Sequence, residues 1–232
     1  MKIALLGYGK MGKVIERIAL ERGHEIVLRK TSSSGFEGLD QADVAIDFSI
    51  PDSAVTNITA CFEQGIPVVS GTTGWLADYE AMVTLCAAKQ GAFIYGSNFS
   101  LGVNLFFELN SYLAKIMAKF DQYRVSMEEI HHTQKLDKPS GTAITLAQGI
   151  MDHSGHGHWT LENSDADGLH IDVKRIENVP GTHRIFYQSE VDTLEISHTA
   201  HNREGFALGA VIAAEWLAPR KGVYTMKDVL EL

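Results

Sequence analysis

Short apolar runs and helically spaced apolar positions alternate along the first hundred residues of the chain. The runs have the length and composition of buried strands, and they lie at residues 2–6, 24–28, 43–48, 67–70 and 92–95. The helical spacing between them predicts helices over 13–22, from 49–52 to just before Gly65, and over 76–90. Strands that alternate with helices in this way predict an α/β fold with a doubly wound parallel sheet.

The pattern changes after residue 100. Further strands are expected at 122–130, 169–176, 183–188 and 192–199. Further helices are expected from 100–104 to about 120, over 143–151 and over 202–217. Apolar and polar residues alternate cleanly over 169–174, as they do in a half-buried strand. A sheet with one or two helices predicts a second, α+β domain, and its open sheet could serve as an assembly surface.

The composition is that of an ordinary soluble globular protein, with 45% hydrophobic and 21% charged residues. The net charge of −9 argues against nucleic acid or an anionic membrane as a partner, while local basic groups still allow an anionic substrate. The chain starts directly with a strand and has no apolar run of membrane-spanning length, so we expect a cytoplasmic protein without a secretory signal. Cys61 and Cys86 are interpreted as buried reduced thiols in helices.

Three histidines in the glycine-rich segment 153–158 raise the question of a metal site. No acid or cysteine nearby is arranged as a co-ligand, and glycine-rich loops hold ligands poorly. We therefore expect a mobile surface loop and no metal there, followed by a turn at 165–168.

A G-x-G-x-x-G motif at 7–12 follows the first strand and opens the first helix. This context is the one that the dinucleotide-binding fingerprint requires, because the glycines let the backbone approach a pyrophosphate at the helix N-terminus. The motif therefore predicts a Rossmann-like dinucleotide site, and the alternative is a tight turn in some other α/β fold. The loops 71–73 and 96–99 also follow strand ends, where ligands bind in such sheets.

The second strand ends with Arg29 and Lys30, where an NAD-specific site usually has a carboxylate for the ribose hydroxyls. Two basic residues would instead suit a 2′-phosphate, so we expect NADPH to be accepted and preferred. The alternative, that both are solvated charges at a strand end, fits the pattern equally well.

The richest stretch spans residues 128–143 and runs from a strand exit through a polar loop into a helix. Adjacent His131 and His132 are followed by Lys135 and then by Ser140, a good helix N-cap. The free N–H groups at such a helix start attract a carboxylate or phosphate. A histidine and a lysine beside them could move protons. Taken singly, the histidine pair and the loop-to-helix junction could each be ordinary surface features.

The run from Glu129 to Ala143 resembles the signature of the 4-hydroxy-tetrahydrodipicolinate reductases, also called dihydrodipicolinate reductases, of the bacterial and plant lysine pathway. The closing segment 222–230 also resembles this family, and agreement is weak only around 153–167. The resemblance implies reduction of 4-hydroxy-tetrahydrodipicolinate with NADPH or NADH, with loss of water, to tetrahydrodipicolinate. It also implies a homotetramer built through the second sheet.

The same resemblance implies the domains and the site residues. A dinucleotide-binding domain would comprise 1–103 plus 204–232, and a substrate-binding and oligomerisation domain would comprise 104–203. His131 would be the general acid/base and Lys135 the proton donor. The residues expected to bind the small dicarboxylate substrate are His132, Ser140, Gly141 and Thr142. The residues expected to bind the dinucleotide are Gly7, Tyr8, Gly9, Lys10, Met11, Gly12, Arg29, Lys30, Gly71, Thr72, Thr73, Gly96, Ser97, Asn98 and Phe99.

Other classes of protein fit less of the sequence. A semialdehyde dehydrogenase would need a catalytic cysteine in the second domain, and none follows Cys86. An amino-acid or aldose dehydrogenase leaves the histidine-lysine run unexplained. A non-catalytic dinucleotide sensor would bind NAD(P)H without any use for the proton-handling groups.

Overall fold

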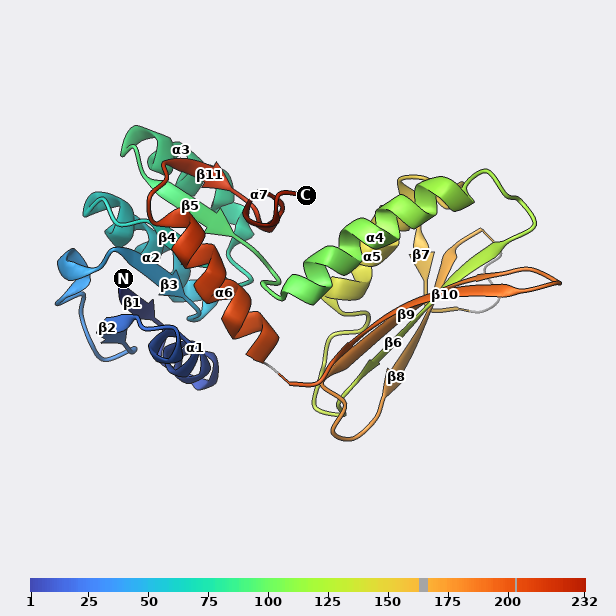
Figure 1. Ribbon diagram of the computed structural model, residues 1–232, viewed down its shortest axis with the longest axis horizontal. Coiled ribbons are helices and arrows are strands. Elements are labelled where there is room, and N and C mark those ends of the chain that lie inside the picture. Colours follow the sequence, from blue (N-terminus) through green and yellow to red (C-terminus); the bar gives the residue numbers. More distant parts are fainter. Residues whose placement is uncertain (163–166, 203) are drawn as a thin grey trace. The chain divides into compact units, whose positions relative to one another are not determined.

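The chain divides into two units in the computed structural model, which describes residues 1–162, 167–202 and 204–232. The first unit comprises Met1–Leu101 and Glu204–Leu232, and the second comprises Gly102–Arg203. Both termini belong to the first unit (Figure 1).

The first unit contains a six-stranded sheet in which every strand pairing is parallel. Its strands are β1 (Lys2–Leu6), β2 (Glu25–Lys30), β3 (Val44–Asp47), β4 (Val68–Ser70), β5 (Ala92–Tyr95) and β11 (Gly222–Tyr224). Their order is β11-β5-β4-β3-β1-β2. The chain therefore moves outward from β1 to β2 and then returns to the other side of β1 with β3. Ligands in doubly wound sheets bind at such a reversal of strand order.

Helices cover both faces of this sheet (Figure 1). They are α1 (Lys10–Glu21), α2 (Pro51–Glu63), α3 (Tyr79–Ala88), α6 (Glu204–Leu217) and α7 (Met226–Leu230). Ile3 and Leu5 of β1 pack with α1 and α6, whereas Ala4 and Leu6 pack on the face of α2 and α3. Alternation of side chains along the strand explains this division. Each large apolar side chain buried in this way contributes about 1.5–3 kcal/mol.

The second unit contains a five-stranded mixed sheet with the order β10-β9-β6-β8-β7. The strands are β6 (Arg124–His131), β7 (Trp159–Thr160), β8 (Leu169–Arg175), β9 (Gly181–Gln188) and β10 (Thr193–Ala200). Helices α4 (Leu101–Met117) and α5 (Gly141–Met151) pack on one face through residues such as Phe106, Leu146 and Ile150. Glu128, Arg184 and Ser197 stand opposite one another on neighbouring strands, and they point to the face of the sheet away from these helices.

The expected α/β fold with a second α+β sheet is confirmed, and the differences are local. Helix α1 begins at Lys10 rather than at residue 13, because Gly9 serves as its N-cap. It ends before Gly23, whose φ of +80° suits glycine at a helix end. Strands β7 and β11 were not expected, and the helix expected over 76–90 is divided into a 3₁₀ turn (Leu76–Asp78) and α3. Residues 165–166 of the expected turn and Arg203 lie outside the described residues.

Candidate functional site

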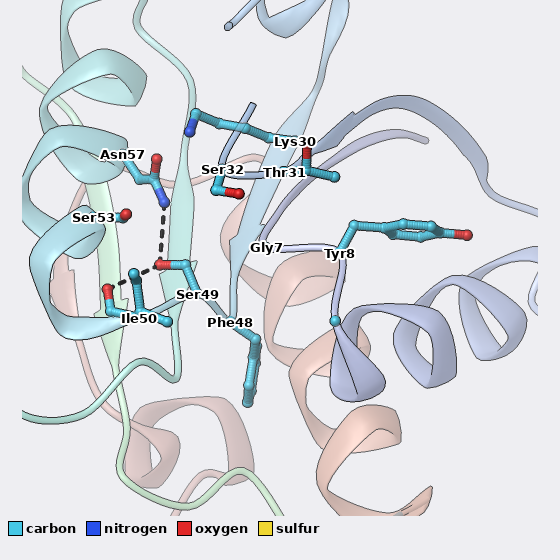
Figure 2. A pocket seen from close by; sticks show the side chains of 11 residues that line it. Gly7, Tyr8, Lys30, Thr31, Ser32, Phe48, Ser49, Ile50, Ser53 and Asn57 are labelled. Atoms are coloured by element: carbon cyan, nitrogen blue, oxygen red, sulfur yellow. Dashed lines mark hydrogen bonds between the residues drawn. The ribbon is translucent and has the colours of Figure 1, made fainter. Parts of the chain in front are cut away.

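A cavity of about 290 Å³ lies where β1 and β3 end, at the reversal of strand order in the first sheet. Gly7 lines it with φ +101°, and a Cβ atom at this position would lie 2.2 Å from the carbonyl oxygen of Phe48. Only glycine can therefore follow β1 here. The cavity is lined by Gly7, Tyr8, Gly9, Lys30, Thr31, Ser32, Phe48, Ser49, Ile50, Ser53 and Asn57, most of which Figure 2 shows as sticks.

The first turn of α1 faces this cavity with exposed backbone. Within the described residues, no side chain caps the helix at Gly9, and apart from its two chain neighbours no atom lies within 4 Å of the position that a Gly9 Cβ would take. A Cβ on Gly12 would lie 2.3 Å from the Gly7 carbonyl oxygen, so the turn can close only around glycine. Lys10 and Met11 form the start of the helix between these glycines. Helix N-termini of this kind attract phosphate.

Arg29 and Lys30 differ in their surroundings although they are adjacent in β2. The Arg29 guanidinium donates to Oε1 of Glu16 at 2.7 Å from its Nε, and Tyr8 donates to the same carboxylate from its hydroxyl. These hydrogen bonds lower the pKa of Glu16. Lys30 lines the cavity, with its Nζ 4.9 Å from the centre of the Phe36 ring. In Figure 2 Lys30 extends toward α2, whereas Tyr8 extends over α1.

A buried carboxylate, that of Asp47 at the end of β3, ties together two loops at this edge of the sheet. It accepts hydrogen bonds from Asn57 and Thr72 at 2.8 Å each and from Ser49 at 2.7 Å, and Ser70 also donates to it. Burial raises the pKa of Asp47, and these hydrogen bonds oppose the rise. The Thr72 hydroxyl also accepts the Ser49 N–H at 2.8 Å, so it holds the loop after β4 against the loop after β3.

The remaining residues predicted for the dinucleotide follow β4 and β5. A Cβ on Gly71 would lie 2.3 Å from the Phe48 ring, so glycine makes room for a ring that lines the cavity. Phe99 is buried, with its ring centre 5.8 Å from that of Phe48. Thr73 and Ser97 are exposed, Gly96 is half-buried, and Asn98 accepts the Ser100 N–H at 2.9 Å. None of these residues is among those lining the cavity in the described structure.

The second unit holds a buried polar cluster around the end of β6. Glu129 is fully buried, and its Oε1 lies 3.3 Å from Nδ1 of His131 and 3.0 Å from the Arg175 guanidinium. The His131 ring packs edge-on against His183 with 5.1 Å between ring centres. Burial and the neighbouring His131 lower the pKa of His183 to about 3. His183 is therefore neutral at neutral pH.

Strand β6 ends between the two adjacent histidines, and they occupy different surroundings. His131 is buried in the cluster around Glu129, whereas His132 is half-buried and lines a cavity of about 540 Å³. Asn202 and residues 177–180 line the same cavity. Nδ1 of His132 is buried and has no hydrogen-bond partner among the described residues. Lys135, in the following loop, pairs with Asp137 at 2.9 Å.

Ser140 caps α5 as the sequence predicts. Its Oγ accepts the Ala143 N–H at 3.2 Å and lies 3.2 Å from Nε2 of His183. The cap therefore occupies the third N–H of the helix and not that of Gly141. Apart from its chain neighbours and the backbone of α5 itself, no atom of the described chain lies within 4 Å of the position of a Gly141 Cβ, which leaves this helix start accessible. Thr142 follows it, half-buried.

Sequence reasoning did not select Glu129, Arg175 and His183, which the structure places around His131. One signal was available for Glu129: it stands two residues before His131 in a strand, and such residues share a face. His183 and Arg175 come from other strands, and only the strand register brings them to this place. Asp47 and the cavity residues of α2 were also not selected from the sequence, because their place in the site depends on which loops meet in the folded chain.

The described residues contain one group with metal-ligand geometry, namely Glu129, His131 and His183, whose ligand atoms lie within 4.8 Å of one another. The Arg175 guanidinium, 3.0 Å from Glu129, already supplies a positive charge to this carboxylate. The segment 153–158 forms no such group in the part of the chain that is described. Searching the same residues, we find no helix with the length and apolarity required to cross a membrane.

Two family models match the chain. One, described as dihydrodipicolinate reductase, N-terminus, matches residues 1–99, and the other, described as dihydrodipicolinate reductase, C-terminus, matches residues 102–230. The second match includes α6 and α7, which fold with the first unit.

Relatives with this family name match over most of the chain. The 4-hydroxy-tetrahydrodipicolinate reductase of Christiangramia forsetii is 55% identical over 99% of this chain and 98% of its own. The reductase of Chromobacterium violaceum is 36% identical over 87% of this chain and 78% of its own. The solved structure of dipicolinate-bound dihydrodipicolinate reductase from Paenisporosarcina sp. TG-14 shares the fold, with a TM-score of 0.77, 22% identity and 97% of each chain covered.

Proposed function

Because this chain belongs to the dihydrodipicolinate reductase family, we propose that its two sites carry out the reduction of 4-hydroxy-tetrahydrodipicolinate. The activity is that of an oxidoreductase of lysine and diaminopimelate biosynthesis. A hydride and a proton are added to the substrate, water is lost, and tetrahydrodipicolinate is formed. The observation that carries the proposal is the segment 131–142, which joins a buried histidine, a lysine and a capped helix start in one strand-loop-helix unit.

The first unit would hold the dinucleotide. When bound, the reduced nicotinamide supplies the hydride. The glycine turn and the open start of α1 fit a pyrophosphate, and Oδ1 of Asn57, which has no hydrogen-bond partner among the described residues, can accept a hydrogen bond from the ligand. Gly71–Thr73 and Gly96–Phe99 would lie on the nicotinamide side, as the family resemblance implies. Their backbones follow neighbouring strand ends, which supports this assignment.

The second unit would hold the substrate and manage its protons. His131 would act as the general acid/base and Lys135 as the proton donor, while His132 would contact the substrate. Gly141 and Thr142 would bind a carboxylate at the start of α5, where N–H groups and the helix dipole favour negative charge. Ser140 supports this role indirectly, because it keeps the helix start in place.

Both NADPH and NADH are proposed as cofactors, with NADPH favoured by the basic pair at the end of β2. Lys30 supports this preference because it lines the cavity. The chain is further proposed to be a cytoplasmic homotetramer assembled through the open face of the second sheet, which carries Glu128, Arg184 and Glu195. Sedimentation velocity would show a species of four chains, and a monomer at micromolar concentration would contradict this assembly.

The proposed function is tested by mixing the purified protein with NADPH and freshly generated 4-hydroxy-tetrahydrodipicolinate and following the reduced-nicotinamide absorbance. We expect rapid oxidation that depends on the substrate. Lys135→Ala should lower turnover by about 10²–10⁴-fold, the usual contribution of a general acid, without weakening NADPH binding. Lys119→Ala, which removes an exposed lysine just after α4, is the matched control. Unchanged turnover in Lys135→Ala would refute Lys135 as the proton donor.

A further inference from the structure

Both carboxylate oxygens of the buried Glu129 have partners in elements that carry the proposed chemistry. Oε2 accepts the Ser140 N–H at 2.7 Å, at the start of α5. Oε1 lies 3.0 Å from the Arg175 guanidinium and 3.3 Å from Nδ1 of His131. Burying a carboxylate away from water costs free energy unless cations and hydrogen-bond donors surround it. This arrangement therefore holds His131 and the start of α5 around a single anion.

The strand register produces this cluster. Glu129 and His131 point to the same face of β6 because they are two residues apart. His183 of β9 stands directly opposite Glu129, and Arg175 of β8 stands opposite His131. A shift of one residue in either pairing would turn these side chains to the other face of the sheet.

Glu129 is ionised at neutral pH. Burial raises the pKa of its carboxyl, but the nearby His131 ring and the hydrogen bond from the Ser140 N–H outweigh burial and lower this pKa to about 2. An ionised carboxylate has no proton to donate, so it can only accept hydrogen bonds. Close to Nδ1 of His131, it favours the ring tautomer that carries a proton on this nitrogen. The other nitrogen, Nε2, then exchanges protons with a substrate.

Gly181 keeps the Nε2 edge of the ring free of a side chain. A Cβ on Gly181 would lie 3.0 Å from Nε2 of His131. The opposite edge of the cluster is closed, since His183 is buried and lies beside the Ser140 hydroxyl. Nδ1 is the His131 nitrogen that faces the Glu129 carboxylate. The two groups are at ion-pair distance, but their geometry is not that of an aligned hydrogen bond. Hydrogen bonds of this kind often tighten when the substrate binds.

Arg175 extends the same support to the lysine loop. Its Nε donates to the carbonyl oxygen of Lys135 at 3.2 Å, and its guanidinium donates to that of Asp137 at 2.5 Å. The guanidinium is in turn paired with Glu129, and the Arg175 side chain is only 10% exposed. The backbone of the proposed proton donor is thus fixed through Arg175 to the carboxylate that faces His131.

We propose that Glu129 is a positioning residue of this reductase: its carboxylate sets the tautomer and orientation of His131 and, through Arg175, anchors the loop that carries Lys135. The inference rests on the proposed function, which assigns the proton chemistry to His131 and Lys135. By distance alone, Glu129, His131 and His183 could also hold a metal. The guanidinium beside the carboxylate favours the positioning role, because it supplies the positive charge that a metal would bring.

The tautomer of His131 tests this proposal without measuring turnover. In ¹⁵N-labelled wild-type protein, the His131 ring nitrogens are assigned by comparison with His131→Asn and their shifts are read at neutral pH. We expect the proton of the neutral ring on Nδ1. In Glu129→Gln, whose amide can itself donate to the ring, we expect the proton to move to Nε2. A neutral wild-type ring protonated on Nε2, or a tautomer that is the same in both proteins, would overturn the proposal.

Kinetics supply the second test. Glu129→Gln should lower kcat by about 10²-fold or more, toward the roughly 10⁴-fold loss caused by a comparable change beside the histidine of serine proteases, and should change the KM for NADPH less than about threefold. Glu190→Gln is the matched control, since this carboxylate is exposed in the turn between β9 and β10. A kcat loss in Glu129→Gln no larger than in Glu190→Gln would refute the positioning role.

The outcomes separate this proposal from the function on which it rests. A wild-type protein that never oxidises NADPH with the substrate would refute the proposed function, while the tautomer of His131 would still test Glu129. Activity lost on chelation and restored by a divalent metal would overturn the positioning role in favour of a metal ligand. If Glu129→Gln does not fold, the wild-type tautomer alone decides.

Discussion

Arg29 and Lys30 show how two adjacent basic residues acquire different roles. Arg29 points along α1, where Glu16 binds its guanidinium. Lys30 lies at the cavity without an acidic partner among the described residues, and its ammonium is near the Phe36 ring. A charged group already held by a carboxylate contributes less to binding a new anion than one that is not. Lys30 is therefore the better candidate for contact with a 2′-phosphate.

We predict that Lys30→Ala lowers kcat/KM for NADPH by roughly 10–100-fold, the usual cost of losing a hydrogen bond to a charged group, and changes kcat/KM for NADH much less. Arg29→Ala is the comparison, and its effect on NADPH should be smaller because Arg29 is held by Glu16. Steady-state kinetics with both cofactors measure the difference. Equal losses with NADPH and NADH in Lys30→Ala would show that Lys30 does not recognise the 2′-phosphate.

The sequence indicated residues whose chemistry is local and not those that depend on strand pairing. Gly7, Gly9 and Gly12 were expected from the motif, because their spacing between a strand and a helix is visible in the sequence, although only Gly12 is constrained by an atom of its own turn, the Gly7 carbonyl oxygen. Glu129 and Arg175 were not expected, because their importance comes from a neighbour on another strand. Register is a long-range property, and local patterns in a single sequence do not reveal which residues will stand opposite one another.

Among the elements, α5 connects fold and site most directly. Its N-cap Ser140 is buried, bonded through its own N–H to Glu129 and through its hydroxyl to the helix and His183. The start of α5 is thus fixed by side chains from β6 and β9. A helix start held in this way presents its first N–H groups in one orientation, which a carboxylate-binding site requires.

We predict that Ser140→Ala lowers the free energy of unfolding by about 1–3 kcal/mol, because it removes the cap and leaves a buried partner unsatisfied. Urea unfolding measures this change. The KM for 4-hydroxy-tetrahydrodipicolinate should rise in the same variant. Ser33→Ala, at an exposed position in the loop after β2, is the control. A Ser140→Ala protein as stable as this control would show that the cap does not hold α5.

Most elements could be predicted from apolar periodicity, and those that could not are short. Strands β1 and β5 have the expected bounds, and the long helices lie where helical spacing places them. β7 and β11 have only two and three residues, so they present no periodicity to detect. They exist because β8 and β5 each offer an edge on which a short segment can pair.

For the whole molecule, buried ionisable groups make folding depend on pH. His183 has its pKa lowered by burial to about 3, so the unfolded chain binds a proton on this residue between about pH 6.5 and 3 while the folded protein does not. Glu129 has a pKa of about 2 in the folded protein, so below about pH 4.5 the unfolded chain also binds a proton on this residue that the folded protein does not. Stability therefore falls as the pH falls, first through His183 and then through Glu129.

We predict that the free energy of unfolding at pH 5 is lower than at pH 7 by about 2 kcal/mol from His183 alone. Urea titrations at the two pH values measure this difference. His183→Gln keeps a polar atom near the position of Nε2 but cannot titrate, so its stability should change less between the two pH values. An equal change in the variant and the wild type would show that His183 does not cause the acid sensitivity.

Transfer of deuterium from 4-deuterated NADPH to the product tests the central claim most directly. The protein is incubated with this cofactor and 4-hydroxy-tetrahydrodipicolinate, and the tetrahydrodipicolinate is analysed by mass spectrometry. We predict a product heavier by one mass unit, with the label lost from the cofactor and the reaction strongly slowed in Lys135→Ala. Demonstrable NADPH binding without any labelled product would contradict the account and indicate a dinucleotide-binding protein with another substrate or with none.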